Sequence, residues 1–471
     1  MTKGLGATWA SEGTTFRVFS ESAKAVFVCI EDEHGTEKRV RLTRGPGHVW
    51  EGFVPNLPLG STYGFRTEGP FSPAQGLWHN PQKLLLDPYA TELSGAVDPS
   101  GPIYSVRKNG LACGENSAAF MPKGVVRERL APLEGSRPMH LLEDTVIYEA
   151  HARGLTMRHP DVPKAHRGTF AGLASDACIS HLKKLGVTTL ELMPVHAAMS
   201  EPRLAKLGLV NYWGYSPLSY FALDPRFAPE GESPVTAFRA AASKLHESGI
   251  EIVVDMVFNH TAELDMLGPC LSFRGLDGRA YYRHDSEGKL VDYTGCGNTV
   301  QTEHPAVVRL VMDALRYGVT VLGIDGYRFD LGVSLGRTRG PFDPWAALLT
   351  AMAVVAAATS GKRRRGSRFR HFSARRRRQL PLCWLRLCLL CFLRRRRRDR
   401  ECFALLCEGN PTKRTQYQQS RSKTNSKLVV HENIAFSLFS EFTRQSIRAA
   451  ESRTCADSKI TRIRRRLVRF L

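Results

Sequence analysis

The chain has 471 residues and a formal net charge of +21, and its length suggests roughly two to four domains. The charge is unevenly distributed, because 31 of the 66 Lys and Arg but only 7 of the 45 Asp and Glu fall after residue 353. Residues 1–353 therefore carry a net charge of about −3, which excludes a polyanion-binding protein as a description of this part. The basicity belongs to residues 354–471 alone.

Cysteine shows the same division along the chain. Residues 1–353 hold five scattered cysteines, and the other six lie in the basic part. None of the five lies in a C-x-x-C pair or at the spacing of zinc ligands, so we interpret them as reduced core thiols of a cytoplasmic protein. The five are Cys29, Cys113, Cys178, Cys270 and Cys296.

Two segments bear on targeting and membranes. Residues Met1–Trp9 contain no apolar run of the kind that a secretory signal requires, which argues against secretion. The longest apolar stretch, Leu380–Leu393, has about fourteen residues and is interrupted by Arg386. It is too short to span a bilayer, so we expect no membrane partner.

In residues 1–92, short β-rich runs alternate with turn signals, a pattern typical of a small β-sandwich. The expected strands are Thr15–Phe19, Ala25–Ile30, Val49–Val54 and Thr62–Arg66. We expect Asp32–Gly35 to form a hairpin turn. Four aromatic residues of this region fit either a sugar-stacking face or a packed core, and core packing is the commoner outcome. They are Trp50, Phe53, Tyr63 and Phe65.

We assign residues 93–143 to a linker, and residues 144–353 to a region where strands and helices alternate. Such alternation predicts a parallel sheet, here the first half of a (β/α)8 barrel. The expected strands are Thr145–Ala150, Val187–Met193, Ile250–Val257 and Val319–Ile324. One helix is expected to end at Gly186, a second to run from Pro234 to Gly249, and a third from Pro305 to Gly318.

Polar residues lie where the third and fourth of these strands end. Asp255, Asn259 and His260 belong to the third strand and its continuation, and Arg328 and Asp330 follow the fourth. Retaining hydrolysis of a glycosidic bond needs one carboxylate to attack the anomeric carbon and a second, protonated carboxyl about 5–5.5 Å away. Asp330 suits the nucleophile, because Arg328 points to the same side of an extended backbone and favours the ionised carboxylate. His260, supported by Asn259, suits hydrogen bonds to sugar hydroxyls.

Taken singly, each of these polar residues is more often a satisfied group at a strand end than a catalytic residue. Their number makes that explanation weaker. A pyranose also needs an aromatic platform for its apolar faces. The segment Asn211–Pro217 supplies Tyr212, Trp213 and Tyr215 in the loop after the second expected strand.

Residues 1 to about 352 resemble glycogen debranching enzymes of the isoamylase type, in glycoside hydrolase family 13 of the alpha-amylase superfamily. The segment Gly76–Tyr89 resembles the end of that family's glycogen-binding module of the family-48 type. Barrel strands one, three and four are matched by Ile147–Thr156, Asp255–His260 and Asp325–Asp330. The debranching subtype is indicated by Asn211–Tyr215, Leu271–Gly275, Asp292–Asn298 and Leu335–Thr338.

This resemblance implies a role for each matching residue. Asp330 would be the nucleophile, Arg328 and His260 would contact the sugar and the nucleophile, and Tyr215 would be the stacking platform. Asp255 would be a supporting carboxylate, and Trp213 and Asn259 would join the substrate-binding residues. The implied reaction is hydrolysis of α-1,6 branch linkages in glycogen, amylopectin or limit dextrin, with no cofactor and no metal ion.

The resemblance stops after about residue 352, where arginine runs begin. The family pattern also requires a Glu as general acid and base and a later His-Asp pair, and neither has a recognisable counterpart. Phe403–Glu408 and Val429–Glu432 imitate these parts without the expected flanks. We therefore interpret residues 354–471 as a tail without recognisable fold, translated out of frame or mis-spliced, and expect the chain to lack its acid.

Three functions follow, and the first is a debranching glycoside hydrolase. The second is an α-glucan-binding protein without catalytic activity. The third is a nucleic-acid or interaction protein that acts through its basic tail, since clustered Lys and Arg neutralise phosphates. A solvated charge run is the commoner outcome for such tails. Nothing in the pattern fixes an oligomeric state.

Overall fold

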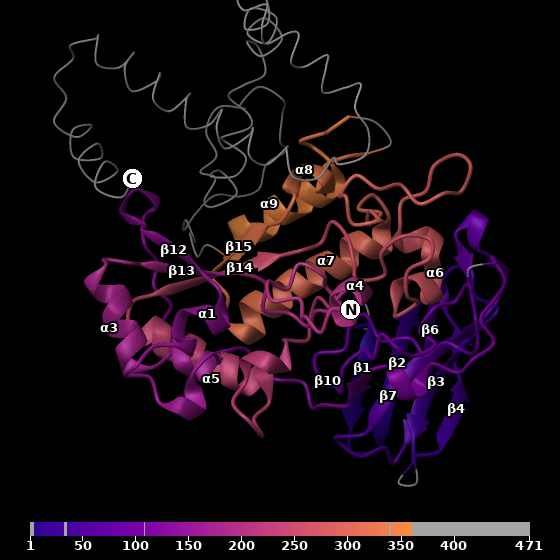
Figure 1. The fold of residues 1–471 in the computed structure, drawn as a ribbon, viewed down its shortest axis with the longest axis horizontal. Helices are drawn as coiled ribbons and strands as arrows, with labels where there is room; N and C mark the ends of the chain where they lie inside the picture. Colours follow the sequence, from indigo (N-terminus) through magenta and orange to yellow (C-terminus); the bar gives the residue numbers. More distant parts are fainter. Residues whose placement is uncertain (1–3, 33–34, 108, 339–340, 360–471) are drawn as a thin grey trace, which may run out of the picture. The chain divides into compact units, whose positions relative to one another are not determined.

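The structure, a computed structural model, describes residues 4–32, 35–107, 109–338 and 341–359 (Figure 1). The chain divides into two units, Met1–Leu387 and Cys388–Leu471, and all described residues belong to the first. The expectations for the tail after residue 359, including its two acid-bearing segments and its nucleic-acid alternative, concern residues outside the described part. Helix α9 (Ala347–Thr359) extends six residues past the expected start of that tail at residue 354.

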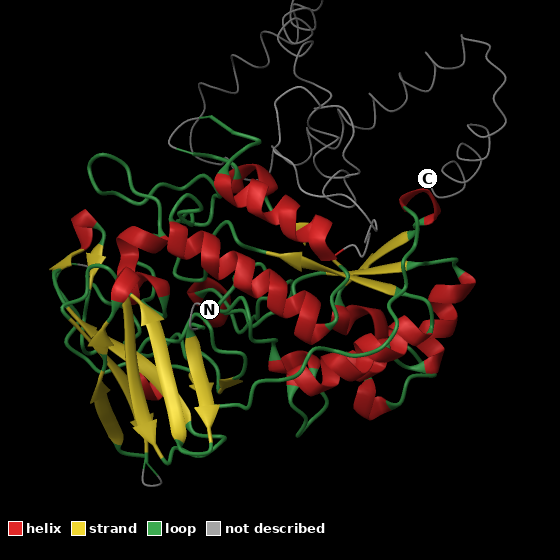
Figure 2. Cartoon of the chain, turned by 180° about the vertical axis from the view of Figure 1, so that it is seen from behind, coloured by secondary structure: helices red, strands yellow, loops and turns green. Residues whose placement is uncertain are grey.

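The N-terminal part forms two antiparallel sheets with a shared apolar core, as predicted (Figure 2). The first sheet has the order β1 (Gly6–Ala10), β2 (Gly13–Phe19), β6 (Val49–Pro55) and β5 (Thr43–Arg44). The second has the order β10 (Leu93–Ser94), β11 (Lys123–Val125), β7 (Thr62–Glu68), β3 (Ala25–Glu31) and β4 (Glu37–Arg41). A small hairpin pairs β8 (Phe71–Ser72) with β9 (Leu77–Trp78).

The aromatic residues of the sandwich mostly pack in its core. Trp50, Tyr63 and Phe65 are at most 4% exposed. The Trp50 indole Nε1 also donates to the Ser20 carbonyl at 2.9 Å, as a buried indole N–H requires. Phe53 is the exception, because half of its surface is exposed. The sugar-stacking interpretation therefore survives for Phe53 alone among the four.

The segment 93–143, expected to be a linker, contributes strands β10 and β11 to the second sheet. Gly124 pairs with Tyr63, and a Cβ at Gly124 would lie 2.8 Å from the Tyr63 ring. Strands of two and three residues are too short to show the alternation that predicts a strand. Their pairing depends on contacts between residues about thirty positions apart for β10 with β11 and about sixty for β11 with β7, which the local pattern does not reveal.

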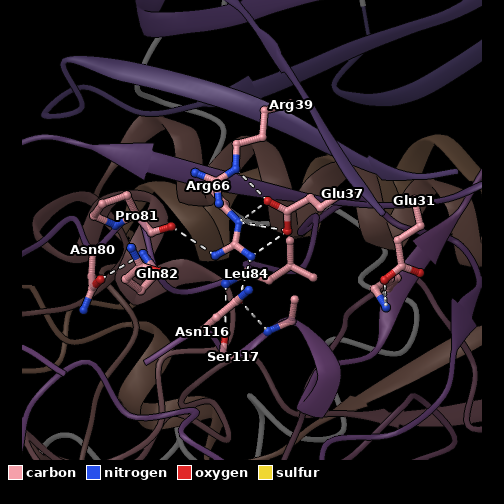
Figure 3. A network of polar contacts seen from close by, with 12 residues as sticks. Glu31, Glu37, Arg39, Arg66, Asn80, Pro81, Gln82, Leu84, Asn116 and Ser117 are labelled. Atoms are coloured by element: carbon pink, nitrogen blue, oxygen red, sulfur yellow. Dashed lines mark hydrogen bonds and ion pairs between the residues drawn. The ribbon is translucent and has the colours of Figure 1, made fainter. Parts of the chain in front are cut away.

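A buried ion pair fastens a later segment of the chain to the second sheet (Figure 3). The Arg66 side chain is fully buried, and its Nε and Nη2 donate to the Glu37 carboxylate at 2.6–3.1 Å. Nη1 donates to the Pro81 carbonyl at 3.0 Å, and Nη2 also donates to Asn116 Oδ1 at 2.7 Å. A buried charge is tolerated when it is paired and hydrogen-bonded, and all three guanidinium nitrogens of Arg66 donate to partners.

The remaining described chain is built around a four-stranded parallel sheet in sequence order, the predicted first half of a (β/α)8 barrel. Its strands are β12 (Ile147–Ala150), β13 (Thr189–Leu192), β14 (Glu251–Met256) and β15 (Gly326–Phe329). The first helices are α1 (Ala152–Met157), α2 (Phe170–Leu173), α3 (Asp176–Lys184), α4 (Pro202–Lys206) and α5 (Pro234–Glu247). They are followed by α6 (Phe273–Tyr281), α7 (Pro305–Tyr317) and α8 (Gly332–Leu335).

The helix boundaries agree with the predicted signals. Helix α5 has Ser233 at its N-cap and Pro234 at its first position. Gly186 and Gly249, which lie just after α3 and α5, have φ angles of 74° and 80°. These left-handed conformations are open to glycine without a Cβ clash, so both helices end there.

The fourth strand lies later than predicted. Residues 318–324 are apolar and β-branched, but Gly318–Leu322 form a π-helical turn that continues α7. Gly323, with a φ angle of 87°, ends the turn, and the strand starts at Gly326. A Cβ at Gly318 would lie 2.0 Å from the Tyr327 hydroxyl, so the absence of a side chain there lets the strand pack against the turn.

Candidate active site

The ends of β14 and β15 bring the predicted polar residues together. Asp255 lies in β14 and pairs in register with Arg328 of β15. Asp330 follows β15 directly, and its backbone N–H still donates to the Met256 carbonyl at 3.0 Å. Asn259, in the loop after β14, completes the group. The carboxyl ends of neighbouring parallel strands meet at one edge of the sheet, so residues far apart in sequence lie close together there.

Asp330 is held from two directions. The Asn259 Nδ2 donates to the Asp330 carbonyl at 2.9 Å and to its Oδ2 at 3.0 Å. The Arg328 Nη1 lies 3.4 Å from Asp330 Oδ1. The Asp330 side chain keeps 17% of its surface exposed. The arrangement fixes the orientation of the carboxylate while leaving it open to a ligand.

Asp255 is the closer partner of Arg328. Arg328 Nη1 makes a short ion pair with Asp255 Oδ2, which also accepts a hydrogen bond of 2.5 Å from the Tyr215 hydroxyl. The other oxygen, Oδ1, is buried and has no partner among the described residues. Burial raises the pKa of Asp255 to about 6, although the Tyr215 hydroxyl and the Arg328 guanidinium oppose the shift.

His260 lies beneath Tyr215. Its Nδ1 faces Asn259 Oδ1, and its Nε2 lies 2.9 Å from the Tyr215 carbonyl. Burial lowers the pKa of His260, and a neutral ring has a single N–H, so it can donate to only one of these two acceptors at a time. Both ring nitrogens of His260, which the sequence suggested for hydrogen bonds to sugar hydroxyls, lie beside protein acceptors. His260 supports Asn259 and the Tyr215 loop in this structure, and its contact with a sugar stays a prediction.

The aromatic segment Asn211–Tyr215 turns sharply before it reaches the site. Asn211 Oδ1 accepts from the Gly214 N–H at 2.8 Å, and Gly214 has a φ angle of 86°. The rings of Trp213 and Tyr215 lie 6.4 Å apart and nearly perpendicular. Trp213 is 63% exposed, whereas Tyr215 is partly buried against Asp255. The turn therefore aims the two rings in different directions, one at the ion cluster and one at solvent.

The residue after Asp330 has a strained backbone. Leu331 has φ and ψ angles of 42° and 44°, the left-handed region that costs a non-glycine residue about 1–3 kcal/mol. It stands at the N-cap of the short helix α8, where the chain leaves the strand. Leu331 is 48% exposed, so little packing compensates the strain. Strain of this kind is found most often at functional sites.

Comparisons with known proteins agree with this geometry. Residues 4–90 match the family Carbohydrate-binding module 48 (Isoamylase N-terminal domain), and residues 155–288 match Alpha amylase, catalytic domain. A glycogen debranching enzyme of Yersinia enterocolitica is 46% identical over 357 residues, which cover 74% of this chain and 53% of that relative. One from Yersinia pseudotuberculosis is 44% identical over 356 residues, with the same coverage.

Over this region the chain is homologous to glycogen debranching enzymes. It spans about half the length of the curated relatives that it matches, 53% for each of these two. Among solved structures, a maltose complex of pullulanase type I from Bacillus subtilis shares the fold, with a TM-score of 0.58 and 23% identity over 76% of this chain and 46% of that chain. A maltotetraose complex of a pullulanase from Anoxybacillus sp. LM18-11 has a TM-score of 0.55 and 27% identity over 71% of this chain and 46% of that chain.

Two further carboxylates escaped the sequence analysis. Glu149 of β12 and Glu191 of β13 pair in register on neighbouring strands of this debranching-enzyme homologue. Burial raises the pKa of Glu191, Glu149 adds to the shift, and Arg328 opposes it, so these groups share the sheet face that carries the ion cluster. The missed signal was a single acidic residue inside each apolar strand.

A cysteine also lies near the cluster. Burial raises the pKa of Cys296, and the carboxylates of Asp292 and Asp330 add to the shift. The five cysteines in the described part are free, and Cys296 is the one that is partly exposed. Across the described ranges, no group of three or more His, Cys, Asp or Glu is placed to hold a metal ion. No helix in the same ranges is both long and apolar enough to cross a membrane.

Proposed function

We propose that the chain belongs to a debranching glycoside hydrolase that cleaves α-1,6 branch linkages of glycogen, amylopectin or limit dextrin with retention. The observation that carries the proposal is the placement of Asp330, which Asn259 and Arg328 hold at the open end of two parallel strands. Asp330 attacks the anomeric carbon and forms a glycosyl ester while the branch oxygen leaves with a proton. Water then hydrolyses the ester and restores the carboxylate.

Each neighbour of Asp330 has a part in this proposal. Asn259 holds one carboxylate oxygen, so the other keeps a free lone pair for attack. Arg328 supplies positive charge that stabilises the ionised nucleophile, and Asp255 and Tyr215 orient Arg328. The proton of the leaving oxygen must come from a second carboxyl group. We assign that acid to no described residue.

The substrate follows from the site and from the names of the relatives. Tyr215 offers a ring beside the ion cluster and Trp213 an exposed ring next to it along the chain, and an α-glucan presents the apolar sugar faces that pack on such rings. The curated relatives are named glycogen debranching enzymes, and the neighbouring pullulanase structures hold maltose and maltotetraose. The sandwich would tether the same polymer, with Phe53 as its exposed aromatic residue. Free, mostly buried thiols support a cytoplasmic location for this enzyme.

The test is release of reducing sugar from a branched limit dextrin by the purified full chain. We expect Asp330→Asn to reduce the rate by more than about 10³-fold, because the nucleophile is lost while the side chain keeps its shape. Asp176→Asn, at the first position of the helix α3 with its side chain 90% exposed, is the control and should leave the rate unchanged. Hydrolysis that survives Asp330→Asn would refute the assignment of the nucleophile.

A second candidate is an α-glucan-binding protein without hydrolysis. It is favoured by the match of residues 4–90 to the carbohydrate-binding module, beside a catalytic match that covers residues 155–288. Co-sedimentation with glycogen, measured beside the hydrolysis assay, separates the two candidates. Binding that Phe53→Ala weakens, with no sugar released, would favour this second function.

A further inference from the structure

A buried knot of hydrogen bonds follows Asn259 and His260 along the chain. Its centre is Glu263, which is 1% exposed. Its Oε1 accepts from the N–H groups of Leu271 and Ser272 at 2.6 and 2.9 Å, and its Oε2 accepts from the Arg274 N–H at 2.8 Å. The Tyr282 hydroxyl donates a further short hydrogen bond to Oε2. One carboxylate thus ties the start of the loop after β14 to its middle.

Arg274 closes the same knot from the other side. Its side chain is 1% exposed and donates to the carbonyls of Glu263, Leu264, Asp265 and Gly268 at 2.6–3.0 Å. A single guanidinium therefore holds four carbonyls of one tight turn. Such a fork cannot be replaced by an ammonium group, because its donors are fixed in one plane.

The knot reaches the active-site segment through Thr261. The Thr261 hydroxyl lies 2.6 Å from the Tyr282 hydroxyl, and the Thr261 N–H donates to Asn298 Oδ1 at 3.0 Å. Farther along, the Val300 N–H donates to the Asn259 carbonyl at 3.0 Å. The two residues that contact Asp330 and Tyr215 are therefore followed directly by backbone that the knot holds.

The other end of the knot is fastened to the sandwich through α6, which packs against β7 and β9 (Figure 1). Asp277 of α6 is 1% exposed, and its Oδ2 accepts from the N–H groups of Glu21 and Ser22 at 2.7 and 2.9 Å. The Arg274 guanidinium lies 4.8 Å from the centre of the Trp78 ring, a cation–π contact.

Three more hydrogen bonds run from the sandwich side to this helix and its flank. Ser20 Oγ donates to the Leu276 carbonyl at 2.7 Å, and Thr67 Oγ1 donates to the Gly275 carbonyl at 2.8 Å. The Leu86 N–H donates to the Leu271 carbonyl at 2.8 Å. The contact is also close, since a Cβ at Gly278 would lie 2.6 Å from the Trp78 ring. Buried, satisfied bonds on both sides leave α6 little freedom to shift.

We propose that the sandwich is a positioning element of the active site as well as a glucan-docking module. Asp277 holds α6 on the sandwich, and Arg274 and Glu263 hold the loop after β14 against α6. Tyr282 joins Glu263 to Thr261, and Thr261 directly follows Asn259 and His260 in the chain. Glu263 and Asp277 are thus positioning residues for the proposed hydrolysis, and the inference rests on the proposed function only where a rate is concerned.

The test compares hydrogen exchange in the full chain with Asp277→Asn, which keeps the side-chain volume but replaces one acceptor oxygen by an N–H₂ donor. Asp277 Oδ2 accepts from the Glu21 and Ser22 amides and Oδ1 from the Ala280 amide, and the single oxygen of Asn can serve only one of these two sides. Asp87→Asn is the matched control, because Asp87 is a fully buried sandwich carboxylate that bonds Tyr63 and Tyr89 instead. We expect Asp277→Asn to speed exchange of the Thr261 and Ala262 amides by about tenfold or more. Asp87→Asn should leave these two amides unchanged.

A second variant keeps the test decisive if Asp277→Asn unfolds. Arg274→Lys removes the fork at the centre of the knot, so exchange at Thr261 and Ala262 should rise by a similar factor. Exchange that rises only at residues 20–23 and 275–281 in Asp277→Asn would overturn the proposal, as would an equal rise in Asp87→Asn. Where limit dextrin is hydrolysed, Asp277→Asn should lower kcat with KM unchanged. If neither the parent chain nor any variant releases sugar, the proposed function fails. The exchange result still decides this inference in that case.

Discussion

Arg66 in the sandwich and Arg328 in the parallel sheet each pair with strand carboxylates, but they differ in how their hydrogen-bonding capacity is used. Arg66 is fully buried, and its three nitrogens all donate to described partners. Arg328 is 38% exposed, and its hydrogen bonds with described residues all come from Nη1. Its neighbour Asp255 likewise keeps one buried oxygen without a described partner.

The difference separates a structural ion pair from a candidate site. A closed network has no donor left for a ligand, so it contributes to stability and to the docking of one segment on another. An open network beside an accessible carboxylate keeps donors and acceptors free for a substrate. Two aspartates extend the comparison, because burial raises the pKa of both Asp87 and Asp255 to about 6, and each accepts a tyrosine hydroxyl.

The largest expected difference in stability is between the two variants that each remove one arginine. Arg66→Met removes the Arg66 donors from Glu37 and the Pro81 carbonyl, and should lower the free energy of unfolding by about 2 kcal/mol or more. Glu37 keeps the donor Arg39, and Asn116 keeps the Ala118 N–H. Arg328→Met should cost about 1 kcal/mol or less at about pH 5, where Asp255 is largely protonated. Urea denaturation at that pH measures both. Equal losses would show that the two networks do not differ in kind.

The second prediction concerns pH and Asp255. Its folded pKa of about 6 lies above the ordinary value of 3.8, so the native state holds the proton more tightly than the unfolded chain. Stability therefore falls as the pH rises from about 4 to about 6, by up to about 3 kcal/mol from this group. Asp255→Asn removes that loss, so the stability difference between variant and parent should grow over this range. In an Arg328→Met background, the fall in stability should extend to higher pH, because Arg328 no longer lowers the pKa of Asp255.

Asp87→Asn serves as the control for the pH prediction. The Asp87 carboxyl group of the parent chain should give a similar fall in stability between about pH 4 and pH 6, because burial dominates its pKa as well. Asp87→Asn should remove that fall. Arg328→Met should not move that fall, since Asp87 bonds Tyr63 and Tyr89 instead. A shift of both profiles would mean that Arg328 acts on global stability and not on Asp255.

Removing the tyrosine hydroxyls gives an intermediate effect. Tyr215→Phe and Tyr63→Phe each take a donor from a buried carboxylate and should cost about 1–2 kcal/mol at pH 7. Both losses should shrink at about pH 4, where the carboxyl groups are protonated. Thermal or urea unfolding at the two pH values checks this. We expect glucan binding to weaken in Tyr215→Phe alone, and weakening in Tyr63→Phe as well would contradict the separation of site from scaffold.

The smallest effect is expected at Leu331. Leu331→Gly relieves a left-handed backbone conformation at an exposed position and should raise stability by about 0.5–1 kcal/mol. Leu209, which is 55% exposed and is not among the residues with positive φ, provides the comparison. Leu209→Gly should lower stability by a few tenths of a kcal/mol, on the order expected for added chain entropy. Denaturant midpoints measure both, and a loss in Leu331→Gly would refute the strain.

Local pattern was sufficient to predict the sandwich, the parallel sheet and the helix ends, because Gly186, Ser233 and Gly249 carry their own conformational signals. The strand prediction failed at Gly318–Leu322, where an apolar run continues a helix as a π-helical turn. The Tyr327 side chain occupies the space beside Gly318, a contact that the local pattern does not reveal. Local pattern also missed β10 and β11, whose pairing is nonlocal.

The same limit applies to the site. Asp255, Arg328 and Asp330 were predictable because they stand at strand ends, where parallel topology gathers them. That Arg328 pairs more closely with Asp255 than with Asp330 depends on the distance between two strands. The bonds that join Asp277 to Glu21 and Ser22 link residues more than 250 positions apart, and no local signal announces them.

The most direct measurement of the nucleophile uses α-maltosyl fluoride, because fluoride leaves the anomeric carbon without needing a proton from a general acid. The full chain is incubated with this substrate, digested, and mapped by mass spectrometry. The account predicts fluoride release and a maltosyl group on the peptide that contains Asp330, with both lost in Asp330→Asn. A maltosyl group on another residue, or no fluoride release from the parent chain, would contradict it.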